Sequence, residues 1–297
     1  MTRLSQRDAT ARPVLGDGEP RPAVSLCVPA YQAQRHLRAT LESLLAQKHA
    51  DFEIVVIDNN SSDGTAEVLA SFGDSRIRVI RNETTLPLVD NFNRAVQQSR
   101  GEFVKLVCAD DLLHPDCIAA QSAVLQQHAN VALVGVQTDF VDDEGGVLRS
   151  KRGLRGIVGL HPAPHVVRRI IRSGTNPIGA PLSAMFRRSD FLRSGGFRDE
   201  WLFLSDVDLW VRLLQYGEFY GIPRSLASFR FGSQTVTATM AARSQLAQYR
   251  SFVHAVSGQQ RWGITRTDRA VGRISMYDKQ LRRTLLFAIS KYRDARR

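Results

Sequence analysis

The sequence predicts an α/β fold, with a mostly parallel sheet flanked by helices and a helical C-terminal extension. From Val24 to about residue 136, short apolar runs alternate with helical stretches, which is the pattern of strands joined by helical crossovers. The runs are apolar on both faces, as strands are when helices cover both sides of a sheet. The 297 residues include 43% hydrophobic and 23% charged side chains, ordinary for one large folded domain or two small ones.

The first half of the chain divides into these elements in a regular order. We expect strands at residues 24–29, 53–57, 77–80, 103–107 and 131–136. Helices are expected on the leucines at 37, 41, 44 and 45, after a turn-rich segment at 58–64, over 89–98 and after Pro115. Ser62 or Asp63 is expected to cap the helix that follows the turn.

The second half is less regular. Residues 143–160 mix glycine with basic residues and predict a mobile loop. Strands are expected at 184–186 and 225–231, a helix over 206–216, and mainly helices from 239 to the end. Residues 1–22, rich in Pro, Gly, Arg and Asp, predict a flexible leader. The expected organisation is a leader at 1–22, one α/β domain at 23–235 and a basic helical segment at 236–297.

The net charge of +11 is concentrated at the C-terminal end. Residues 241–297 hold 13 Lys and Arg against three Asp and Glu, which leaves the rest of the chain with 27 basic and 26 acidic residues. Residues 281–293 mix apolar and basic side chains with a helical period. Two interpretations stay open: a helix at 281–297 on an anionic membrane surface, or a helix packed on the body with a solvated basic face. No recognised nucleic-acid motif accompanies the charge, so we expect no nucleic-acid partner.

Cysteine usage and hydropathy predict a cytoplasmic protein. Cys27, Cys108 and Cys117 are too few and too irregularly spaced for a disulfide framework, and we expect reduced, buried thiols. No apolar run approaches the roughly 18 residues of a membrane span, and residues 1–20 lack the apolar core of a signal peptide. If the C-terminal helix binds lipid, the protein is expected to lie peripherally at the inner face of the membrane.

Polar and aromatic side chains follow three of the expected strands. Tyr31 follows the first strand, Asp58 the second, and the pair Asp110 and Asp111 the fourth. Each aspartate alone is typical of a turn or a helix cap, and Tyr31 alone is compatible with an ordinary surface aromatic residue. Ligands of open parallel sheets bind beyond the carboxyl ends of the strands, so together these side chains predict one crevice.

That crevice suits a nucleoside diphosphate. An aromatic ring stacks on a base, a carboxylate accepts hydrogen bonds from a base or a ribose, and a carboxylate pair holds Mg²⁺ or Mn²⁺. Neither G-x-G-x-x-G nor G-x-x-x-x-G-K-[ST] occurs, which disfavours dinucleotide oxidoreductases and P-loop NTPases. The metal on Asp110 and Asp111 is therefore the expected source of charge neutralisation for the phosphates.

These residues resemble the motifs of a family-2 inverting glycosyltransferase with the GT-A fold, a Rossmann-related architecture. The resemblance rests on segments 28–31, 57–65 and 108–115, and on the downstream Gly195-Gly196-Phe197, Asp-Val-Asp-Leu-Trp-Val-Arg at 206–212 and Gly217. It covers about residues 24–232. It implies a GT-A domain with a donor half at 23–142 and an acceptor half at 143–235. It also implies sugar transfer from a nucleotide sugar, UDP favoured, to a glycan or lipid-linked acceptor in cell-surface polysaccharide synthesis.

The resemblance implies donor-side roles residue by residue. Pro29 and Tyr31 would border the base, and Asp58 would bind the base or ribose. Asp110 would be the main metal ligand, with Asp111 beside it. Asn93 and Lys105 are weaker candidates for contact with the donor phosphates. The alternatives are a structural role for Asn93 and a solvated side chain for Lys105.

On the acceptor side, Asp206 matches the family's general base, and a helix cap is its alternative role. Asp208 is a rival base that we expect instead to pair with an arginine. Trp210 and Gly196 are acceptor-side candidates, although a tryptophan at this spacing is also typical of a core residue.

Two positions depart from the family pattern. Cys108 stands where the family's Asp-x-Asp motif has its first carboxylate, and Gly232 stands where many members carry a histidine. A metal-independent variant therefore stays open. So do an inactive GT-A-fold scaffold that binds a partner and, among enzymes, a nucleotidyltransferase.

Overall fold

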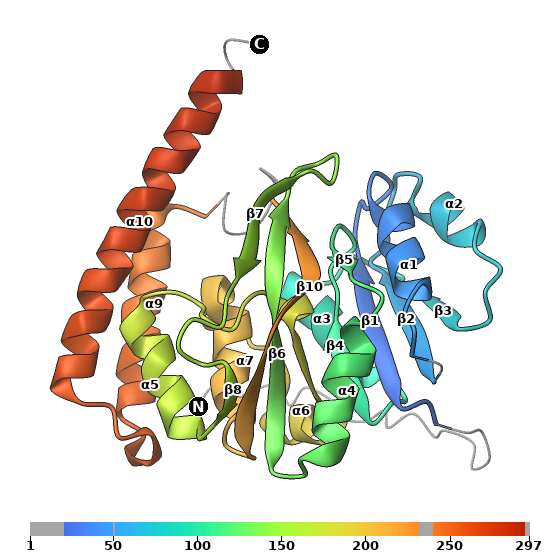
Figure 1. The fold of residues 1–297 in the computed structure, drawn as a ribbon. Helices are drawn as coiled ribbons and strands as arrows, with labels where there is room; N and C mark the ends of the chain where they lie inside the picture. Colours follow the sequence, from blue (N-terminus) through green and yellow to red (C-terminus); the bar gives the residue numbers. More distant parts are fainter. Residues whose placement is uncertain (1–20, 50, 232–239, 295–297) are drawn as a thin grey trace, which may run out of the picture.

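The computed structural model describes residues 21–49, 51–231 and 240–294, with side chains as far as Leu281 in the last segment. It contains one mixed sheet between layers of helices (Figure 1). The strands, in chain order, are β1 (Val24–Ala30), β2 (Phe52–Asp58), β3 (Ile77–Arg81), β4 (Phe103–Leu106), β5 (Leu112–Leu113), β6 (Val131–Val141), β7 (Val147–Arg152), β8 (Gly159–His161), β9 (Ala184–Arg187) and β10 (Glu218–Arg230).

Most of the sheet runs in one direction, as the sequence predicts. The order is β3-β2-β1-β4-β9-β6-β10-β5, with β7 on β6 and β8 on β10. Strands β3, β2, β1 and β4 pair in parallel, and so do β6 and β10, whereas β9 is antiparallel to both of its neighbours. The antiparallel β9 therefore joins two parallel blocks that point the same way.

Helices cover the sheet on both faces. One face packs against α1 (Leu37–Leu45), α2 (Thr65–Ala70) and α4 (Cys117–Gln127), around buried residues such as Leu41 and Ile118. The other packs against α3 (Leu88–Gln97), α5 (Ala163–Ser173), α6 (Arg188–Ser194) and α7 (Ser205–Leu213), around Phe186 and Trp210. Successive residues of β1 alternate between the two cores, with Leu26 in one and Cys27 in the other. This explains why the strands are apolar on both faces.

The prediction of a mobile loop at 143–160 is wrong. Residues 147–152 form β7, which extends the edge of the sheet on β6, and residues 159–161 form β8 on β10. These two segments become strands because they pair with β6 and β10. A local composition rich in glycine and arginine does not reveal such pairing. The sequence analysis also missed α5 and α6. The predicted leader lies outside the described residues apart from positions 21 and 22, and the domain limit at 235 lies outside them as well.

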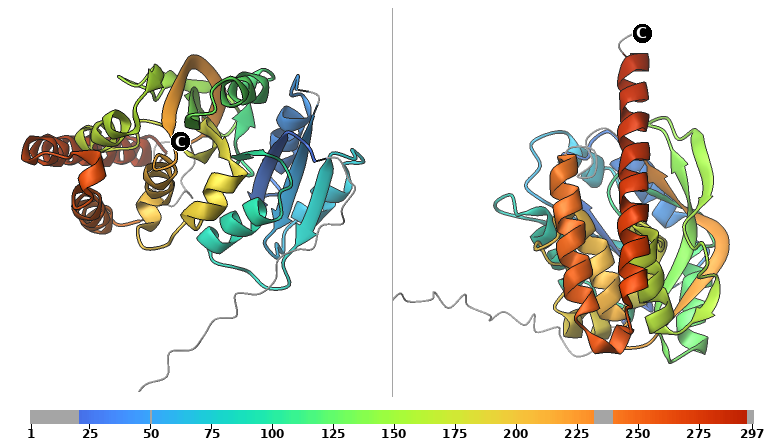
Figure 2. Two further views of the ribbon diagram at one scale, coloured as in Figure 1. Left: turned by 90° about the horizontal axis from the view of Figure 1, so that it is seen from below. Right: turned by 90° about the vertical axis from the view of Figure 1, so that its left-hand side faces the viewer.

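The C-terminal segment is helical, as predicted. Helix α9 (Ala242–Ser257) and the long α10 (Arg266–Asp294) stand side by side on the α5 side of the molecule (Figure 2). Gly272 lets α10 approach α5, because a Cβ there would lie 2.3 Å from the carbonyl oxygen of Ile171. Within the described part of the chain, no helix has the length and apolar character needed to cross a bilayer. The side chains of 282–297, on which the proposed membrane contact partly depends, lie outside the described residues.

Candidate active site

Three adjacent strands bring the predicted donor residues to one edge of the sheet. Ala30, the last residue of β1, is in register with Asp58, the last residue of β2, and β4 flanks β1 on its other side. Tyr31 follows β1 directly and is 53% exposed, so its ring is available to a ligand. Pro29, in contrast, is buried within β1. Of the two residues expected to border a base, only Tyr31 offers an accessible face.

Asp58 is a buried carboxylate with both oxygens engaged. Its Oδ1 accepts a 3.0 Å hydrogen bond from the backbone N–H of Ser61, and its Oδ2 forms a 2.7 Å ion pair with Arg81. These contacts fix the turn after β2. A ligand at this position would have to share the carboxylate with Arg81, which is itself half-exposed.

Asp63 does not cap α2 in the expected way. The N-cap residue is Gly64, one position later. The side chain of Asp63 accepts hydrogen bonds from the backbone N–H and the hydroxyl of Thr65 and from the backbone N–H of Gln34. Desolvation raises the pKa of Asp63, but the hydrogen bonds together outweigh it, so the pKa lies below its ordinary value. Asp63 therefore ties α2 to the loop after β1.

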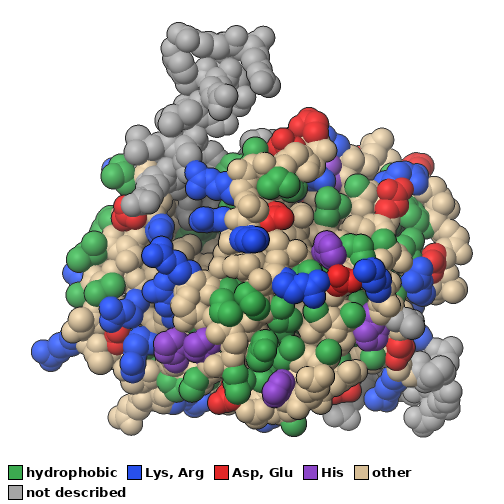
Figure 3. All heavy atoms as spheres, in the orientation of Figure 1, with side chains coloured by type: hydrophobic (Ala, Val, Ile, Leu, Met, Phe, Trp, Pro, Cys, Tyr) green, Lys and Arg blue, Asp and Glu red, His purple; other side chains and the backbone are tan. Residues whose placement is uncertain are grey.

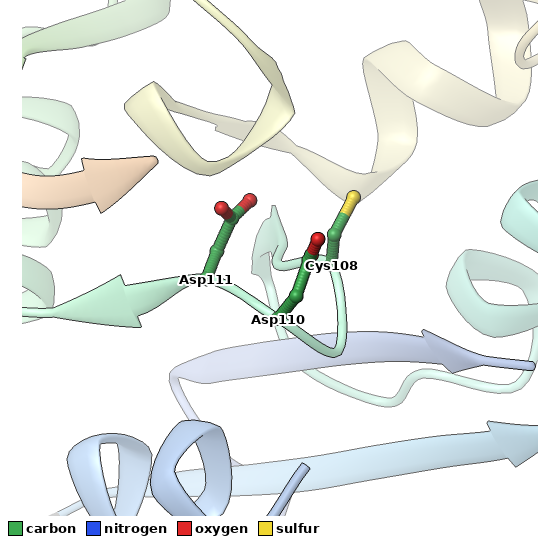
Figure 4. A group of neighbouring side chains, drawn as sticks. All are labelled: Cys108, Asp110 and Asp111. Carbon is green, nitrogen blue, oxygen red and sulfur yellow. The ribbon is translucent and has the colours of Figure 1, made fainter. Parts of the chain in front are cut away.

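The loop between β4 and β5 gathers Cys108, Asp110 and Asp111 (Figure 4). Their three side chains point to the same side of the loop, and their potential ligand atoms lie within 4.8 Å of one another. Asp110 and Cys108 are partly exposed, and Asp111 is buried. The cluster therefore combines two solvent-accessible residues with one that protein encloses.

The two carboxylates have the chemical features of a divalent-cation site. Asp111 Oδ1 accepts a 3.0 Å hydrogen bond from the backbone N–H of Arg230, but its buried Oδ2 has no hydrogen-bond partner among the described residues. Desolvation raises the pKa of Asp110, and it raises the pKa of Asp111 well above the ordinary value, with the charge of Asp110 adding to the effect. A hard divalent ion would satisfy the orphaned oxygen and offset both penalties.

Cys108 does not complete an oxygen-ligand set. Desolvation, followed by the charges of Asp111, Asp110 and Asp206, raises the pKa of its thiol well above the ordinary value, so it stays protonated at neutral pH. A protonated thiol is a poor ligand for Mg²⁺ or Mn²⁺, which prefer oxygen. The residues present therefore fit such an ion through Asp110 and Asp111 alone.

Arg230 connects the β4–β5 loop to the end of β10, and no role was predicted for it from the sequence. It is buried at the end of β10, its Nε donates to the carbonyl of Asp110, and its Nη1 donates to the carbonyls of Asp142 and Asp143. The side chain of Asp143 forms a 3.0 Å ion pair with Arg35. Arg230 thus joins the β4–β5 loop to the β6–β7 turn, and a lone arginine in a strand gives no sequence signal for this role.

Asp206 lies in the first turn of α7. Leu204 occupies the N-cap position, so the alternative prediction of Asp206 as the N-cap is wrong. Its Oδ2 accepts a 2.8 Å hydrogen bond from Asn176, and its Oδ1 accepts one of 2.7 Å from the N–H of Val207. Desolvation nevertheless raises the pKa of Asp206 to about 6. The residue as a whole is partly exposed.

Asp208 forms the structural pair expected of it. Its Oδ2 accepts two hydrogen bonds from Arg212, one turn along α7, at 2.9 Å from Nε and 2.7 Å from Nη2. Both side chains are buried, and Arg212 also donates to the carbonyl of Ser194. A carboxylate engaged in this way is not free to take a proton from an acceptor.

Lys105 is not a donor-phosphate residue, and it is not solvated. Its side chain is fully buried, and its ammonium donates to Gln121 at 2.7 Å and to the carbonyl of Ala184 at 3.4 Å. Burial lowers its pKa. Lys105 therefore serves as a polar link between β4, α4 and the start of β9.

Asn93, Gly196 and Trp210 also have structural roles. The amide of Asn93 exchanges two hydrogen bonds with the backbone of Phe197, at 3.0 and 2.7 Å. Gly196 adopts φ +71°, and a Cβ there would lie 2.5 Å from Asn93 Oδ1, so the turn after α6 requires glycine. Trp210 is fully buried, and its indole donates to the carbonyl of Gly179 at 3.3 Å. A fully buried ring cannot contact an acceptor, so Trp210 is not an acceptor-side residue and its alternative role in the core is confirmed.

Comparison with known proteins identifies the family. The description "Glycosyl transferase family 2" matches residues 25–194, which is more than half of the chain. The chain is a family-2 glycosyltransferase. The family match confirms the resemblance to family-2 glycosyltransferases that the sequence motifs indicated.

Curated relatives of this glycosyltransferase include several bacterial proteins. It is 31% identical over 227 residues to an uncharacterized Mycobacterium tuberculosis protein, MT1568, covering 75% of this chain and 71% of the relative. It is 28% identical over 204 residues to the putative glycosyltransferase EpsE of Bacillus subtilis, covering 66% and 68%. A shorter match, 34% over 89 residues, covers 30% of this chain and 35% of the Escherichia coli UDP-Glc:alpha-D-GlcNAc-diphosphoundecaprenol beta-1,3-glucosyltransferase WfgD.

Solved structures share its fold. Staphylococcus aureus TarS 1–349 in complex with UDP-GlcNAc superposes with a TM-score of 0.60 at 18% identity, covering 78% of this chain. This chain spans 66% of that TarS fragment. The mannosyltransferase PcManGT from Pyrobaculum calidifontis, in complex with GDP-Man and Mn²⁺, superposes with a TM-score of 0.57 at 18% identity, covering 91% of this chain and 73% of the other. The likeness at this identity shows a common GT-A fold.

Proposed function

We propose that this family-2 glycosyltransferase moves a sugar from a UDP-sugar to an acceptor hydroxyl with inversion at the anomeric carbon. The observation that carries the proposal is the approach of Asp206 to the β4–β5 loop. Its charge raises the pKa of Cys108, which lies beside Asp110 and Asp111. In this proposal, a candidate base and a candidate cation site from opposite halves of the chain would border one space.

The donor nucleotide would lie along the carboxyl ends of β2, β1 and β4. The exposed ring of Tyr31 supplies a stacking face for the base, and Asp58 supplies acceptor oxygens at the end of the neighbouring strand. The UDP-GlcNAc bound to TarS supports uridine as the base. This placement leaves the diphosphate next to Asp110.

Asp110 and Asp111 would hold a Mg²⁺ or Mn²⁺ ion through their free carboxylate oxygens. When bound, the ion supplies Lewis-acid stabilisation of the charge that develops on the leaving diphosphate. Arg230 donates to the main-chain carbonyl of Asp110 and to Oδ1 of Asp111, and these hydrogen bonds fix the loop that carries both carboxylates. The Mn²⁺ in the PcManGT complex supports a divalent metal for an enzyme of this fold.

Asp206 would act as the general base. The acceptor hydroxyl gives its proton to a carboxylate oxygen of Asp206, its oxygen forms a bond to the anomeric carbon, and the bond from that carbon to the diphosphate oxygen breaks. One displacement of this kind inverts the configuration. Asn176 positions the carboxylate through Oδ2, and a pKa of about 6 leaves the base ionised at neutral pH.

We propose a glycan or lipid-linked acceptor in cell-surface polysaccharide synthesis at the cytoplasmic side of the membrane. The name of WfgD, which specifies a diphosphoundecaprenol-linked sugar as its acceptor, supports the lipid-linked class. Proton NMR of the reaction with UDP-, GDP- and dTDP-sugars, each with Mn²⁺, tests the proposal. We expect turnover of a UDP-sugar with an anomeric configuration in the product opposite to that in the donor. Retention of configuration, or turnover of GDP- or dTDP-sugars alone, would contradict the mechanism or the donor respectively.

A further inference from the structure

A cleft of about 480 Å³ separates α9 from α10. The two helices stand side by side, and α10 extends beyond α9 (Figure 2). In Figure 1 they lie at the opposite side of the molecule from α1 and α2. The cleft contains none of the residues assigned to sugar transfer, and its lining consists of Tyr249, Arg250, Val253, His254, Arg269, Arg273, Met276 and Tyr277.

The lining has an apolar floor and a basic rim. Tyr249 and Met276 are buried, and the hydroxyl of Tyr249 is already used in a hydrogen bond to the carbonyl of Ile171. Arg250, Arg269 and Arg273 are exposed around this floor. Among the residues that the structure describes, no carboxylate lines the cleft, so the described lining carries a positive charge.

The rim arginines are available to an anion. Among the described residues, no ion pair joins Arg269 or Arg273 to an acidic side chain, and Arg250 donates a hydrogen bond to the hydroxyl of Tyr277. The nearby Asp268 points to α5, where it pairs with two other arginines, Arg168 and Arg172. Guanidinium groups present paired N–H donors that match the oxygens of a phosphate. The chemistry that complements this rim is therefore a phosphate group.

An exposed apolar stripe lies next to the cleft on α10. Ile274, Tyr277 and Leu281 are 73%, 44% and 61% exposed, and their spacing of three and four residues places them on one face of the helix. Figure 3 shows Lys and Arg side chains crowded over the part of the surface near α5 and α10, whereas acidic and basic groups alternate elsewhere on that face. A basic phosphate cleft beside apolar side chains is the pattern of a surface that meets lipid headgroups and acyl chains together.

We propose that the α9–α10 cleft binds the phosphate of an anionic lipid headgroup, with the Ile274–Tyr277–Leu281 stripe entering the adjoining apolar layer. The occupant is a lipid because a free phosphate would use only the rim and would leave the exposed stripe unexplained. This site is separate from the sugar-transfer site and does not depend on the function proposed for that site.

Vesicle flotation of the full-length protein tests the site by a readout independent of activity. We expect binding to vesicles that contain phosphatidic acid, and binding at least tenfold weaker for neutral phosphatidylcholine vesicles. The double variant Arg269→Gln/Arg273→Gln should lose at least tenfold. The control Arg243→Gln/Lys279→Gln removes two charges from the same helices outside the cleft and should lose less than threefold. Circular dichroism checks that both variants stay folded.

Three results would overturn the proposal. Equal losses in the two double variants would mean that overall charge, and not this cleft, binds the vesicles. Saturable binding of inorganic pyrophosphate by calorimetry, without vesicle binding, would make the ligand a soluble phosphate. A concentration-dependent dimer in sedimentation that Ile274→Glu dissociates would assign the stripe to a second copy of the chain.

Discussion

Asn176 Nδ2 donates a 2.8 Å hydrogen bond to Oδ2 of Asp206, across thirty residues of sequence. The same amide donates to the carbonyl of Gly179, and its Oδ1 accepts the N–H groups of Ile178 and Gly179. The loop before β9 is therefore folded around this side chain, which orients the carboxylate at the start of α7. Desolvation opposes the hydrogen bonds to Asp206 and raises its pKa to about 6.

Asp206→Asn should reduce kcat by about 10²–10⁴-fold, because an amide of the same size cannot take the acceptor proton. The donor KM should change little, since Asp206 does not border the expected nucleotide position. Steady-state kinetics with and without acceptor measures both quantities. Asp199→Asn, a substitution of an exposed aspartate outside the site, is the matched control. Unchanged kcat in Asp206→Asn would remove Asp206 as the base.

The kcat/KM of transfer should fall as the pH drops below about 6. A general base acts in its ionised form, and the folded-state pKa of Asp206 is raised from 3.8 to about 6. The rate is therefore expected to be flat above this pH and to decrease about tenfold for each unit below it. A pH–rate profile at saturating Mn²⁺ measures this acidic limb, the decrease of kcat/KM at low pH. If Asp206→Asn keeps the same limb, another group and not Asp206 causes it.

Asn176→Asp should move that limb to higher pH. The substituted side chain keeps the oxygen that accepts from Ile178 and Gly179, but it replaces the donor to Asp206 with a second carboxylate. Loss of the donor and the added negative charge both disfavour ionised Asp206, so its pKa rises by about one unit or more. The same pH–rate profile measures the shift. A profile identical to that of the wild type would mean that Asn176 does not act on the reacting carboxylate.

Cys108→Asp should strengthen metal binding and weaken the metal-free fold. A third carboxylate beside Asp110 and Asp111 adds an oxygen ligand, but without an ion it adds charge repulsion in a partly buried loop. We expect a lower Tm without metal and a larger rise of Tm on addition of Mn²⁺. Cys108→Ser, which changes the atom without adding charge, should leave both nearly unchanged. Thermal unfolding over a Mn²⁺ titration measures this, and equal Mn²⁺ responses in the two variants would contradict the cation site.

Gly272→Ala should weaken the packing of α10 on α5. The new methyl group would lie 2.3 Å from the carbonyl oxygen of Ile171, and a main-chain atom cannot yield as a flexible side chain can. We expect the free energy of unfolding to fall by about 1–3 kcal/mol. Gly258→Ala, whose methyl group would meet its nearest neighbour at 3.6 Å, should change it by about 0.5 kcal/mol or less. Urea unfolding measures both, and equal effects would mean that α10 does not pack closely at Gly272.

The sequence predicted the fold through its strands. The expected strand at 24–29 became β1, and the expected helix at 89–98 became α3, because both follow from local apolar periodicity. The order of polar residues at strand ends also predicted that Tyr31 follows β1 at the edge of the sheet where β2 ends at Asp58. Strands β7 and β8 escaped prediction because partners distant in the sequence stabilise them.

The wrong predictions within the site concern residues whose burial could not be read from the sequence. Nothing in the sequence around Lys105 distinguishes a phosphate ligand from an ammonium bonded to Gln121 in the core. Trp210 could face a sugar or the interior until the packing of α7 was known. Arg230 and Asn176 act through main-chain carbonyls and a distant carboxylate, and such roles depend on tertiary contacts that no short motif records.

The location of bound Mn²⁺ tests the central claim most directly. Anomalous scattering from a crystal grown with UDP and Mn²⁺ gives the position of the ion independently of any assumed mechanism. We predict that the ion lies on the carboxylates of Asp110 and Asp111, with the diphosphate on the side that faces Asp206. An ion bound elsewhere, or a nucleotide on the far side of the sheet from Asp206, would contradict this account.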